Sequence, residues 1–578
     1  MKKMKKVLAV ILSLAMVLGM SLTTFAAENT NATGSENDKV DITITGLSPK
    51  QTVTLYKIAE GDYQGSGAGA FVKYVWAEGI SEEIQKKAET GLSSTEITSI
   101  VNDIKDNSIK AIGTPIVKND VGTTYIENVG VGAYIAVITG ASDGYIYNPI
   151  LLTATYNATG VLVGGEIAAN TALYGGEAVA KRTEADVDKE ITSGTTNDTS
   201  IPDNANENKT KYTASVGDVL GYTITPTIPT YPKNAKNKTL FVSDKMSAGL
   251  DFDVASLRIK VGNAEPVAAV DGKFIYDGKE IASVDTTRVQ NGFYLNFKYD
   301  NILGADDTPY DIKVTYSARV NENAVVGEVG NKNEAKMYYA NDPTNGSTFE
   351  PDDEHPTPDG AEGVIKKEDE EIVYTYQISF LKTGQGEDAA ALAGATFGIY
   401  KDSACTQLVD VVVTNEKGYA VSTSVAAGMY YVKEIQAPTG YSLNDTVYPV
   451  EAKWTSATKT VTRAETEIKY TTEKDEAISD IVVGSIKNGV FYNTLNLPDS
   501  KPAYILSKTE TSTQEVTPID NEGVVGGTVV MGDAIPNTKL SNLPSTGGIG
   551  TTIFTIGGCA IMIIAAALFF ASRRRAVK

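Results

Sequence analysis

Two charged side chains stand where the alternation of the sequence would bury them. In the run 374–382, every second residue from Tyr374 is apolar until Lys382 ends the same face, and in the run 430–434 Glu434 ends a similar face. Burial favours an uncharged lysine amine, which is a nucleophile, and a protonated carboxyl group, which can donate to an amide oxygen and shuttle protons. The simpler interpretation is a salt bridge between Lys382 and Glu434 at the edge of a core.

The letters around these residues resemble the CnaB-type, prealbumin-like (SpaA-like) domains of Gram-positive pilins. Leu-Ala-Gly-Ala-Thr-Phe follows Lys382 at 392–397, and Glu434 lies in a Tyr-x-Val-x-Glu-x-x-Ala-Pro-x-Gly-Tyr box at 430–441. The resemblance implies that Lys382 bonds to an asparagine on the last strand, for which Asn537 is the match, with Glu434 as the catalytic acid. Such an isopeptide bond releases ammonia, and fixed near-attack geometry supplies its rate.

The middle of the chain carries a second set of this kind. Lys189 shares a strand face with Val187 and Ile191, Asp244 shares one with Leu240 and Val242, and Asn333 begins a face that continues through 335, 337 and 339. The set resembles a CnaA-type pilin domain, which implies a Lys189–Asn333 bond with Asp244 as the acid. Asn331 has the same parity as Asn333 and is the alternative partner.

The elements that must position these residues are mostly strands. Short alternating runs rich in Val, Ile, Thr and Tyr, separated by Gly, Asn, Asp and Pro, predict an all-β protein. The resemblance to pilins implies that its domains are tandem Ig-like and prealbumin-like sandwiches. The run 81–106 instead predicts one or two amphipathic helices inserted in the first domain. Composition breaks divide the chain into an N-terminal β domain at 27–176, a middle CnaA-like isopeptide domain at 177–341, an acidic linker at 342–371 and a C-terminal CnaB-like domain at 372–540. No comparable triad occurs in the first domain, where we expect no bond.

Both ends of the chain are predicted to be processing segments. Residues 1–26 have the basic, apolar and small-residue regions of a signal peptide, so the mature chain would begin at Ala27. At the other end, an uncharged apolar run at 549–571 is long enough for a transmembrane helix and precedes a basic tail.

The pentapeptide before this run resembles the LPxTG sorting signal of Gram-positive surface proteins, in a segment that extends over 543–578. The resemblance implies that a sortase cleaves between Thr546 and Gly547 and holds Thr546 as a thioester until an amine takes it. An ordinary single-span anchor behind a chance LPxTG is the alternative. The pentapeptide consists of Leu543, Pro544, Ser545, Thr546 and Gly547.

Composition excludes several classes of function. Eight of the 51 basic residues lie in the two end segments, so 43 remain against 72 acidic residues, a net charge of about −29 that disfavours nucleic acid as a partner. Only Cys405 lies outside the apolar C-terminal run, so the chain cannot form a disulfide within its ectodomain. The single histidine, His355, lies in a linker-like stretch, and we therefore expect neither a histidine-dependent triad, nor a metal site, nor a cofactor.

An acceptor lysine is needed if the Thr546 acyl group passes to another subunit. Lys233 lies in Tyr231-Pro232-Lys233-Asn234, the core of the family's pilin motif, but within the middle domain rather than before its first strand. Lys181 occupies the usual position without the motif. Both remain candidates.

These features predict a structural subunit of a sortase-assembled, cell-wall-anchored pilus with a role in adhesion, not an enzyme. The expected partners are a sortase, identical subunits and peptidoglycan, with accessory pilins and surface ligands as further candidates. The alternatives are a monomeric wall-anchored adhesin and a surface hydrolase that uses paired carboxylates.

Overall fold

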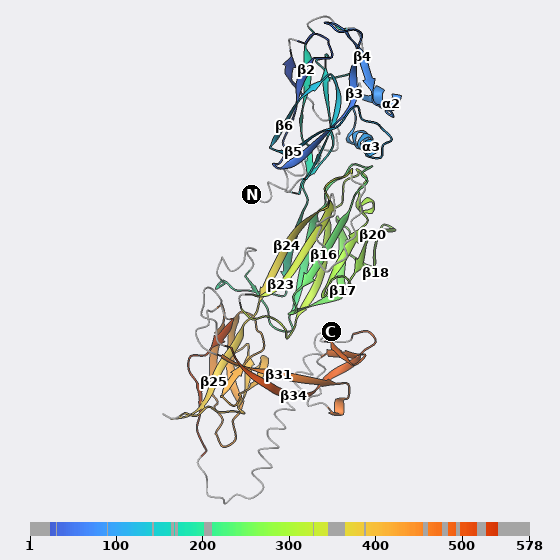
Figure 1. Cartoon of the computed structure of the whole chain (residues 1–578). Helices are drawn as coiled ribbons and strands as arrows, with labels where there is room; N and C mark the ends of the chain where they lie inside the picture. Colours follow the sequence, from blue (N-terminus) through green and yellow to red (C-terminus); the bar gives the residue numbers. More distant parts are fainter. Residues whose placement is uncertain are drawn as a thin grey trace, which may run out of the picture.

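Three β domains lie end to end in the computed structural model, in which the chain runs from the blue domain through the green one to the orange one (Figure 1). The structure describes residues 24–29, 32–88, 91–140, 144–162, 167, 171–201, 211–327, 329–344, 364–386, 389–454, 461–476, 484–492, 497–516 and 527–540. The predicted all-β fold of tandem sandwich domains is confirmed. Within these residues, no helix is both long and apolar enough to cross a membrane, and the predicted span at 549–571 lies outside them.

The first domain is a mixed sheet in the order β4-β3-β7-β9-β10-β2-β6, with β1 on β10 and β5 on β3. Its strands are β1 (Thr24–Asn29), β2 (Lys39–Thr45), β3 (Gln51–Tyr63), β4 (Phe71–Trp76), β5 (Ile116–Val121), β6 (Thr124–Gly130), β7 (Gly132–Thr139), β8 (Ile146–Tyr147), β9 (Ile150–Thr155) and β10 (Leu173–Val179).

The predicted helical patch forms two helices, α2 (Glu82–Ala88) and α3 (Ser94–Lys105). A capping box starts α3, because the Ser93 hydroxyl accepts from the Glu96 amide and the Glu96 carboxylate accepts from the Ser93 amide. Its apolar face, which includes Ile97 and Ile104, packs on the sheet. The helix lies at the end of the first domain that faces the middle domain (Figure 1).

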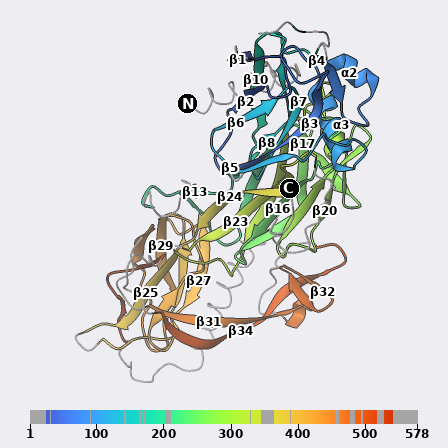
Figure 2. The ribbon, with the colours of Figure 1, turned by 45° about the horizontal axis from the view of Figure 1, so that its top comes forward.

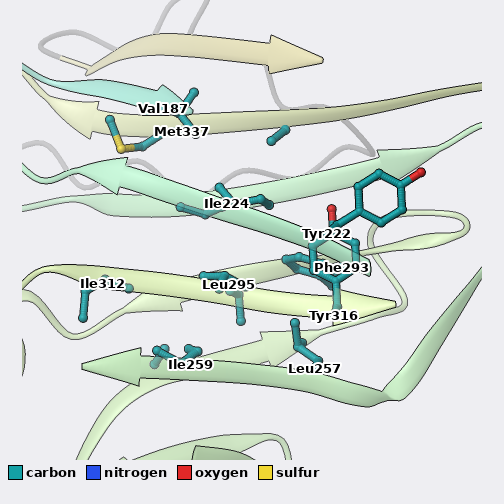
Figure 3. Packing of buried hydrophobic residues seen from close by; sticks show 14 of the residues in the cluster. Val187, Tyr222, Ile224, Leu257, Ile259, Phe293, Leu295, Ile312, Tyr316 and Met337 are labelled. Carbon is teal, nitrogen blue, oxygen red and sulfur yellow. The ribbon is translucent and has the colours of Figure 1, made fainter. Parts of the chain in front are cut away.

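The middle domain is a folded-over sheet in the order β12-β15-β22-β17-β18-β19-β20-β21-β16-β23-β24-β14-β13. Alternating side chains of its strands fill one large apolar core, where Tyr222, Tyr316 and Phe293 gather at one end (Figure 3). The strands are β11 (Arg182–Thr183), which pairs with β8, then β12 (Asp186–Ser193), β13 (Thr196–Asn197), β14 (Tyr212–Thr213), β15 (Val219–Thr227), β16 (Leu240–Met246), β17 (Leu250–Val261), β18 (Val267–Val270), β19 (Lys273–Tyr276), β20 (Lys279–Asp285), β21 (Gly292–Phe297), β22 (Ile312–Val320), β23 (Asn331–Ala340) and β24 (Val364–Tyr374), with a short 3-10 helix at Tyr299–Ile302.

The expected linker at 342–371 includes part of a strand. β24 pairs antiparallel with the whole of β23, from Asn331 opposite Val373 to Ala340 opposite Val364. The acidic composition suggested a linker because a charged run at 366–371 occupies the middle of β24, between apolar residues at its two ends. Tyr374 accordingly ends a strand of the middle sheet, whereas the sequence suggested that it starts the strand of Lys382.

The third domain packs two small sheets, β28-β25-β35 with β36 on β25, and β27-β26-β29-β30. A ribbon of β31 and β34 leaves this sandwich and carries β32 and β33 at its far end (Figure 2). The strands are β25 (Gln377–Gly384), β26 (Thr396–Tyr400), β27 (Leu408–Val413), β28 (Tyr419–Val421), β29 (Gly428–Gln436), β30 (Val447–Ala452), β31 (Val461–Thr471), β32 (Gly484–Lys487), β33 (Val490–Tyr492), β34 (Lys501–Val516), β35 (Thr528–Val530) and β36 (Ile535–Asn537), with a 3-10 turn at Lys474–Glu476.

Candidate functional site

Lys382 is fully buried near the end of β25, in the third domain. Its amine donates to the carbonyl oxygens of Ile535, at 2.8 Å, and Thr383, at 3.1 Å. Burial lowers the pKa of this amine to about 8, although the nearby Glu434 carboxyl opposes the shift. A larger share of the amine is therefore neutral at physiological pH than for a solvated lysine.

Glu434 and Asn537 meet beside this amine. β36 pairs parallel with β25, so that Ile535 lies opposite Lys382 and Asn537 opposite Gly384. The Asn537 amide nitrogen donates to both Glu434 carboxyl oxygens at 2.9 Å, and both side chains are buried. The Asn537 Oδ1 atom is buried without a hydrogen-bond partner in the described residues. Rotation about Cβ–Cγ would turn that oxygen toward Glu434, which could then donate to it when protonated.

Lys189 and Asp244 form the corresponding pair in the middle domain. Both side chains are wholly buried, and the Lys189 amine donates to Asp244 Oδ2. Burial lowers the pKa of the lysine and raises that of the aspartate, so the environment favours an amine and an acid over an ion pair. The amine also lies 5.2 Å from the ring centroids of both Tyr222 and Tyr316.

The Tyr316 hydroxyl joins the members of this site. It accepts from the Lys189 amine, donates to Asp244 Oδ2 at 2.7 Å and accepts from the Asn333 amide nitrogen at 3.1 Å. The sequence did not single out Tyr316, because a tyrosine on the core face of β22 looks like an ordinary core aromatic. Knowledge that β22 lies near β12 in the sheet was needed to find it.

The two candidate asparagines differ in their surroundings. The Asn331 side chain is used locally: its Oδ1 accepts from the Val325 amide at 2.8 Å, and its Nδ2 donates to the carbonyls of Val325 and Val373. Asn333 instead turns its amide to Tyr316, and its Oδ1 is buried without a partner in the described residues. Asn333 is thus linked through Tyr316 to Lys189 and Asp244, whereas Asn331 stabilises the start of β23.

The two acceptor candidates lie near the junction of the first and middle domains. The Lys233 side chain is 74% exposed and its amine is 3.5 Å from Asp307. Lys181 is partly buried next to β11, which lowers the pKa of its amine, and its carbonyl accepts from the Asn148 amide. The sorting pentapeptide at 543–547 lies outside the described residues.

Tandem β-sandwiches with a buried lysine, acid and asparagine between strands define the class of Gram-positive pilin domains. Models of known families match four segments: a T6 antigen Ig-like domain at 37–182, a Gram-positive pilin backbone subunit 2, Cna-B-like domain at 216–343, a SpaA prealbumin-like fold domain at 376–467 and an LPXTG cell wall anchor motif at 535–578. The middle-domain model is described as Cna-B-like, whereas the sequence suggested the CnaA type.

A similar sequence and a similar solved structure each cover most of the chain. The trypsin-resistant surface T6 protein of Streptococcus pyogenes serotype M6 is 40% identical over 570 residues, which is 98% of this chain and 99% of that protein. The solved structure of the T6 backbone pilin of serotype M6 S. pyogenes is 38% identical, with a TM-score of 0.69 over 88% of this chain and all of that one. The chain belongs to this family of backbone pilins and is a structural, cell-wall-anchored surface protein.

Proposed function

We propose that this chain is the shaft subunit of a sortase-assembled pilus, joined to the next subunit through Thr546 and Lys233 and reinforced by two internal isopeptide bonds. It catalyses no reaction on an outside substrate. The observation that carries the proposal is the convergence, in two domains, of a buried lysine, an acid and an asparagine from three different strands.

The bond in the third domain would join Lys382 to Asn537. The neutral Lys382 amine attacks Asn537 Cγ, the bond from Cγ to Nδ2 breaks, and the nitrogen leaves as ammonia after it takes up a proton. Glu434 is within hydrogen-bond distance of the amide and can pass the amine's proton to the leaving group. The lowered pKa of Lys382 supports this step, because a protonated amine has no lone pair for the attack.

The bond in the middle domain would join Lys189 to Asn333, with Asp244 in the role of Glu434. Tyr316 bridges the three groups and holds them together before reaction. The local hydrogen bonds of Asn331 support Asn333 as the partner, since Asn331 could react only by giving up its contacts with Val325 and Val373.

Lys233 is favoured over Lys181 as the acceptor by its exposure. A sortase must bring a thioester carbonyl to the lysine amine, which requires the amine to project from the surface. Lys181 is partly buried at the junction beside β11. A sortase, identical subunits and peptidoglycan are then the partners of the chain, and adhesion at the cell surface follows from the length of the polymer.

Mass spectrometry of the ectodomain tests the two internal bonds. We expect the intact mass to fall below the sequence mass by two ammonia molecules. Glu434→Gln should restore one of them, whereas Glu451→Gln, on the exposed side of the neighbouring strand β30, should restore none. An unchanged sequence mass for the wild-type chain would rule out both bonds.

A wall extract boiled in detergent tests the polymer. The shaft subunit should give a ladder of high-mass species that is absent in Lys233→Arg. A single band from the wild-type chain would instead support a monomeric wall-anchored adhesin, and a ladder from Lys233→Arg that disappears in Lys181→Arg would move the acceptor to Lys181.

A further inference from the structure

The loop that carries Lys233 is held on one side by the middle domain. The Tyr231 side chain is buried, its hydroxyl donates to the Ala340 carbonyl at 2.5 Å, and its amide donates to the Tyr299 hydroxyl at 3.0 Å. A turn follows, in which the Ala235 amide donates to the Pro232 carbonyl at 2.9 Å. Tyr231 therefore fixes the start of the loop in the core of its own domain.

The other side of the same loop is held by the first domain. The side-chain nitrogen Nδ2 of Asn234 donates to the Thr95 carbonyl of α3 at 2.8 Å and to the Ser99 hydroxyl. In return, the Asn102 side chain of α3 donates to the Asn234 carbonyl at 3.1 Å. Lys233 thus lies between a residue bound to the middle domain and a residue bound to the first.

A second set of contacts supports the far end of the loop. The Lys236 amide donates to the Pro343 carbonyl at 2.8 Å, and its side chain pairs with Asp106 just after α3. On either side of Pro343, Asp342 and Thr344 accept from the Lys105 amine at 3.2 Å and 2.6 Å. The end of α3 therefore reaches the loop both directly and through the segment 342–344.

These contacts are polar, whereas the first domain is attached elsewhere by an apolar contact. Ile146 of the first domain is part of the middle-domain core, and the Tyr339 hydroxyl of the middle domain donates to the Gly144 carbonyl at 2.6 Å. Loss of one polar contact at α3 should leave that attachment in place, because each polar contact is worth little beside the burial of an apolar side chain. The contacts of α3 can therefore be tested separately from folding.

We propose that α3 of the first domain is a positioning element for the acceptor lysine, and that Asn102 and Lys105 act through the loop 231–238 to hold Lys233 where a sortase-bound thioester can reach it. The proposal rests on Lys233 as the acceptor. In the segment Tyr231-Pro232-Lys233-Asn234, the tyrosine binds the middle domain and the asparagine binds the first domain. The lysine side chain projects between them into solvent. The acceptor site is then complete only when the two domains are docked.

The test uses variants in α3, so that the letters around Lys233 stay unchanged for any sortase that reads them. Asn102→Ala and Lys105→Ala each remove contacts across the junction, and Asp103→Ala, at an exposed position of the same helix, is the matched control. The full chain is expressed in cells with its own sortase, and the rate at which monomer enters the ladder is followed by pulse-chase. We expect a loss of about fivefold for Asn102→Ala, the effect of one net hydrogen bond. Lys105→Ala removes two contacts and should lose at least as much, and Asp103→Ala should lose nothing.

Amide exchange of the purified chain provides a readout beyond activity. The amides of 233–236 should exchange faster in Asn102→Ala and Lys105→Ala than in Asp103→Ala, with the thermal unfolding of the first domain unchanged. Wild-type polymerisation rates in both variants, with Lys233→Arg inactive, would overturn the positioning role and leave the acceptor intact. Polymerisation of Lys233→Arg at the wild-type rate would instead overturn the acceptor assignment, and the positioning role with it.

Discussion

Removal of the Tyr316 hydroxyl should prevent or slow the bond in the middle domain. Tyr316→Phe deletes the atom that contacts Lys189, Asp244 and Asn333 and keeps the ring, which stacks on Tyr222 at 5.4 Å between centroids. Figure 3 shows the two rings side by side at the end of the core. Without the hydroxyl, the asparagine amide loses the contact that links it to the amine and the acid.

The size of the effect on stability follows from the loop that the bond closes. Lys189 and Asn333 enclose about 145 residues, for which the chain-entropy relation for a crosslink gives about 5 kcal/mol. For a domain of this size, that corresponds to a fall of roughly 10–20 °C in the unfolding temperature. A buried amine and amide left without the tyrosine add about 1–3 kcal/mol.

The assay combines intact mass with calorimetry on four chains. In Tyr316→Phe, part or all of the molecules should have a mass higher than that of the wild-type chain by one ammonia, corrected for the substitution, because they lack the middle-domain bond. These molecules should unfold at the lower temperature. Tyr222→Phe is the matched control, because its ring stacks on Tyr316 and its buried hydroxyl makes no contact with Lys189 or Asp244 within hydrogen-bond distance among the described residues. Lys189→Met removes the amine together with the bond, so its loss of stability measures the bond without leaving a buried amine.

Two results would refute this reasoning. A fully crosslinked Tyr316→Phe with the wild-type unfolding temperature would show that the hydroxyl has no part in the reaction. If the wild-type mass shows that the crosslink has formed and Lys189→Met is nevertheless as stable as the wild-type chain, the crosslink does not stabilise the domain by closing the loop.

Further predictions concern the third domain and its junction with the middle domain. In Asn537→Ala the Lys382 amine cannot form the bond and stays free. The free energy of unfolding should then rise with pH between about 8 and 10.5, because over this range the unfolded chain still holds a proton that the folded chain has released. Urea titrations at several pH values measure this dependence, and a flat profile would contradict it. Asp198 accepts from the Tyr376 hydroxyl at 2.6 Å and from the Trp454 amide at 3.3 Å across this junction. Asp198→Asn should weaken this docking by about 1–3 kcal/mol, visible as faster amide exchange at Trp454. Burial opposes the ionisation of Asp198, but hydrogen bonds from Ser200, Tyr376 and the Trp454 amide outweigh it and hold the pKa of this carboxyl below 3.8. Its contribution in the parent chain should therefore persist at neutral pH and disappear only as the pH falls through that lowered pKa.

The sequence predicted most of the site because alternation reports burial. Lys189, Asp244 and Lys382 stood out as charged residues on apolar faces, and all three are buried. Tyr316 could not be predicted, since a tyrosine on a core face has the same pattern whether its hydroxyl is used or not. The strand β24 was missed for the opposite reason: its central residues 366–371 are all charged, and all but Glu371 lie at the surface or half-buried, so only its pairing with β23 reveals it.

The contacts of α3 with the Lys233 loop could not be predicted either. They join residues more than a hundred positions apart, through short polar side chains that have no characteristic spacing. The helix itself was predictable from its apolar face, but its polar face gave no sign of which surface it meets.

The positions of the proposed bonds determine which parts of the pilin carry tension. A pull on Thr546 reaches Asn537 in β36, a strand of only three residues that a load could peel from β25. With the Lys382–Asn537 bond formed, the load enters β25 directly and runs along the backbone through β24 to β23, which holds Asn333. The Lys189–Asn333 bond then closes the loop that contains Lys233.

In the proposed Thr546–Lys233 linkage the first domain lies outside this path, because Lys233 follows it in the chain and would take the load from the next subunit. Its contacts with the Lys233 loop can therefore be weak and polar without limiting the strength of the shaft. That division of roles agrees with the absence of a comparable lysine, acid and asparagine set in the sequence of the first domain: a domain that positions a lysine during assembly needs no covalent reinforcement afterwards.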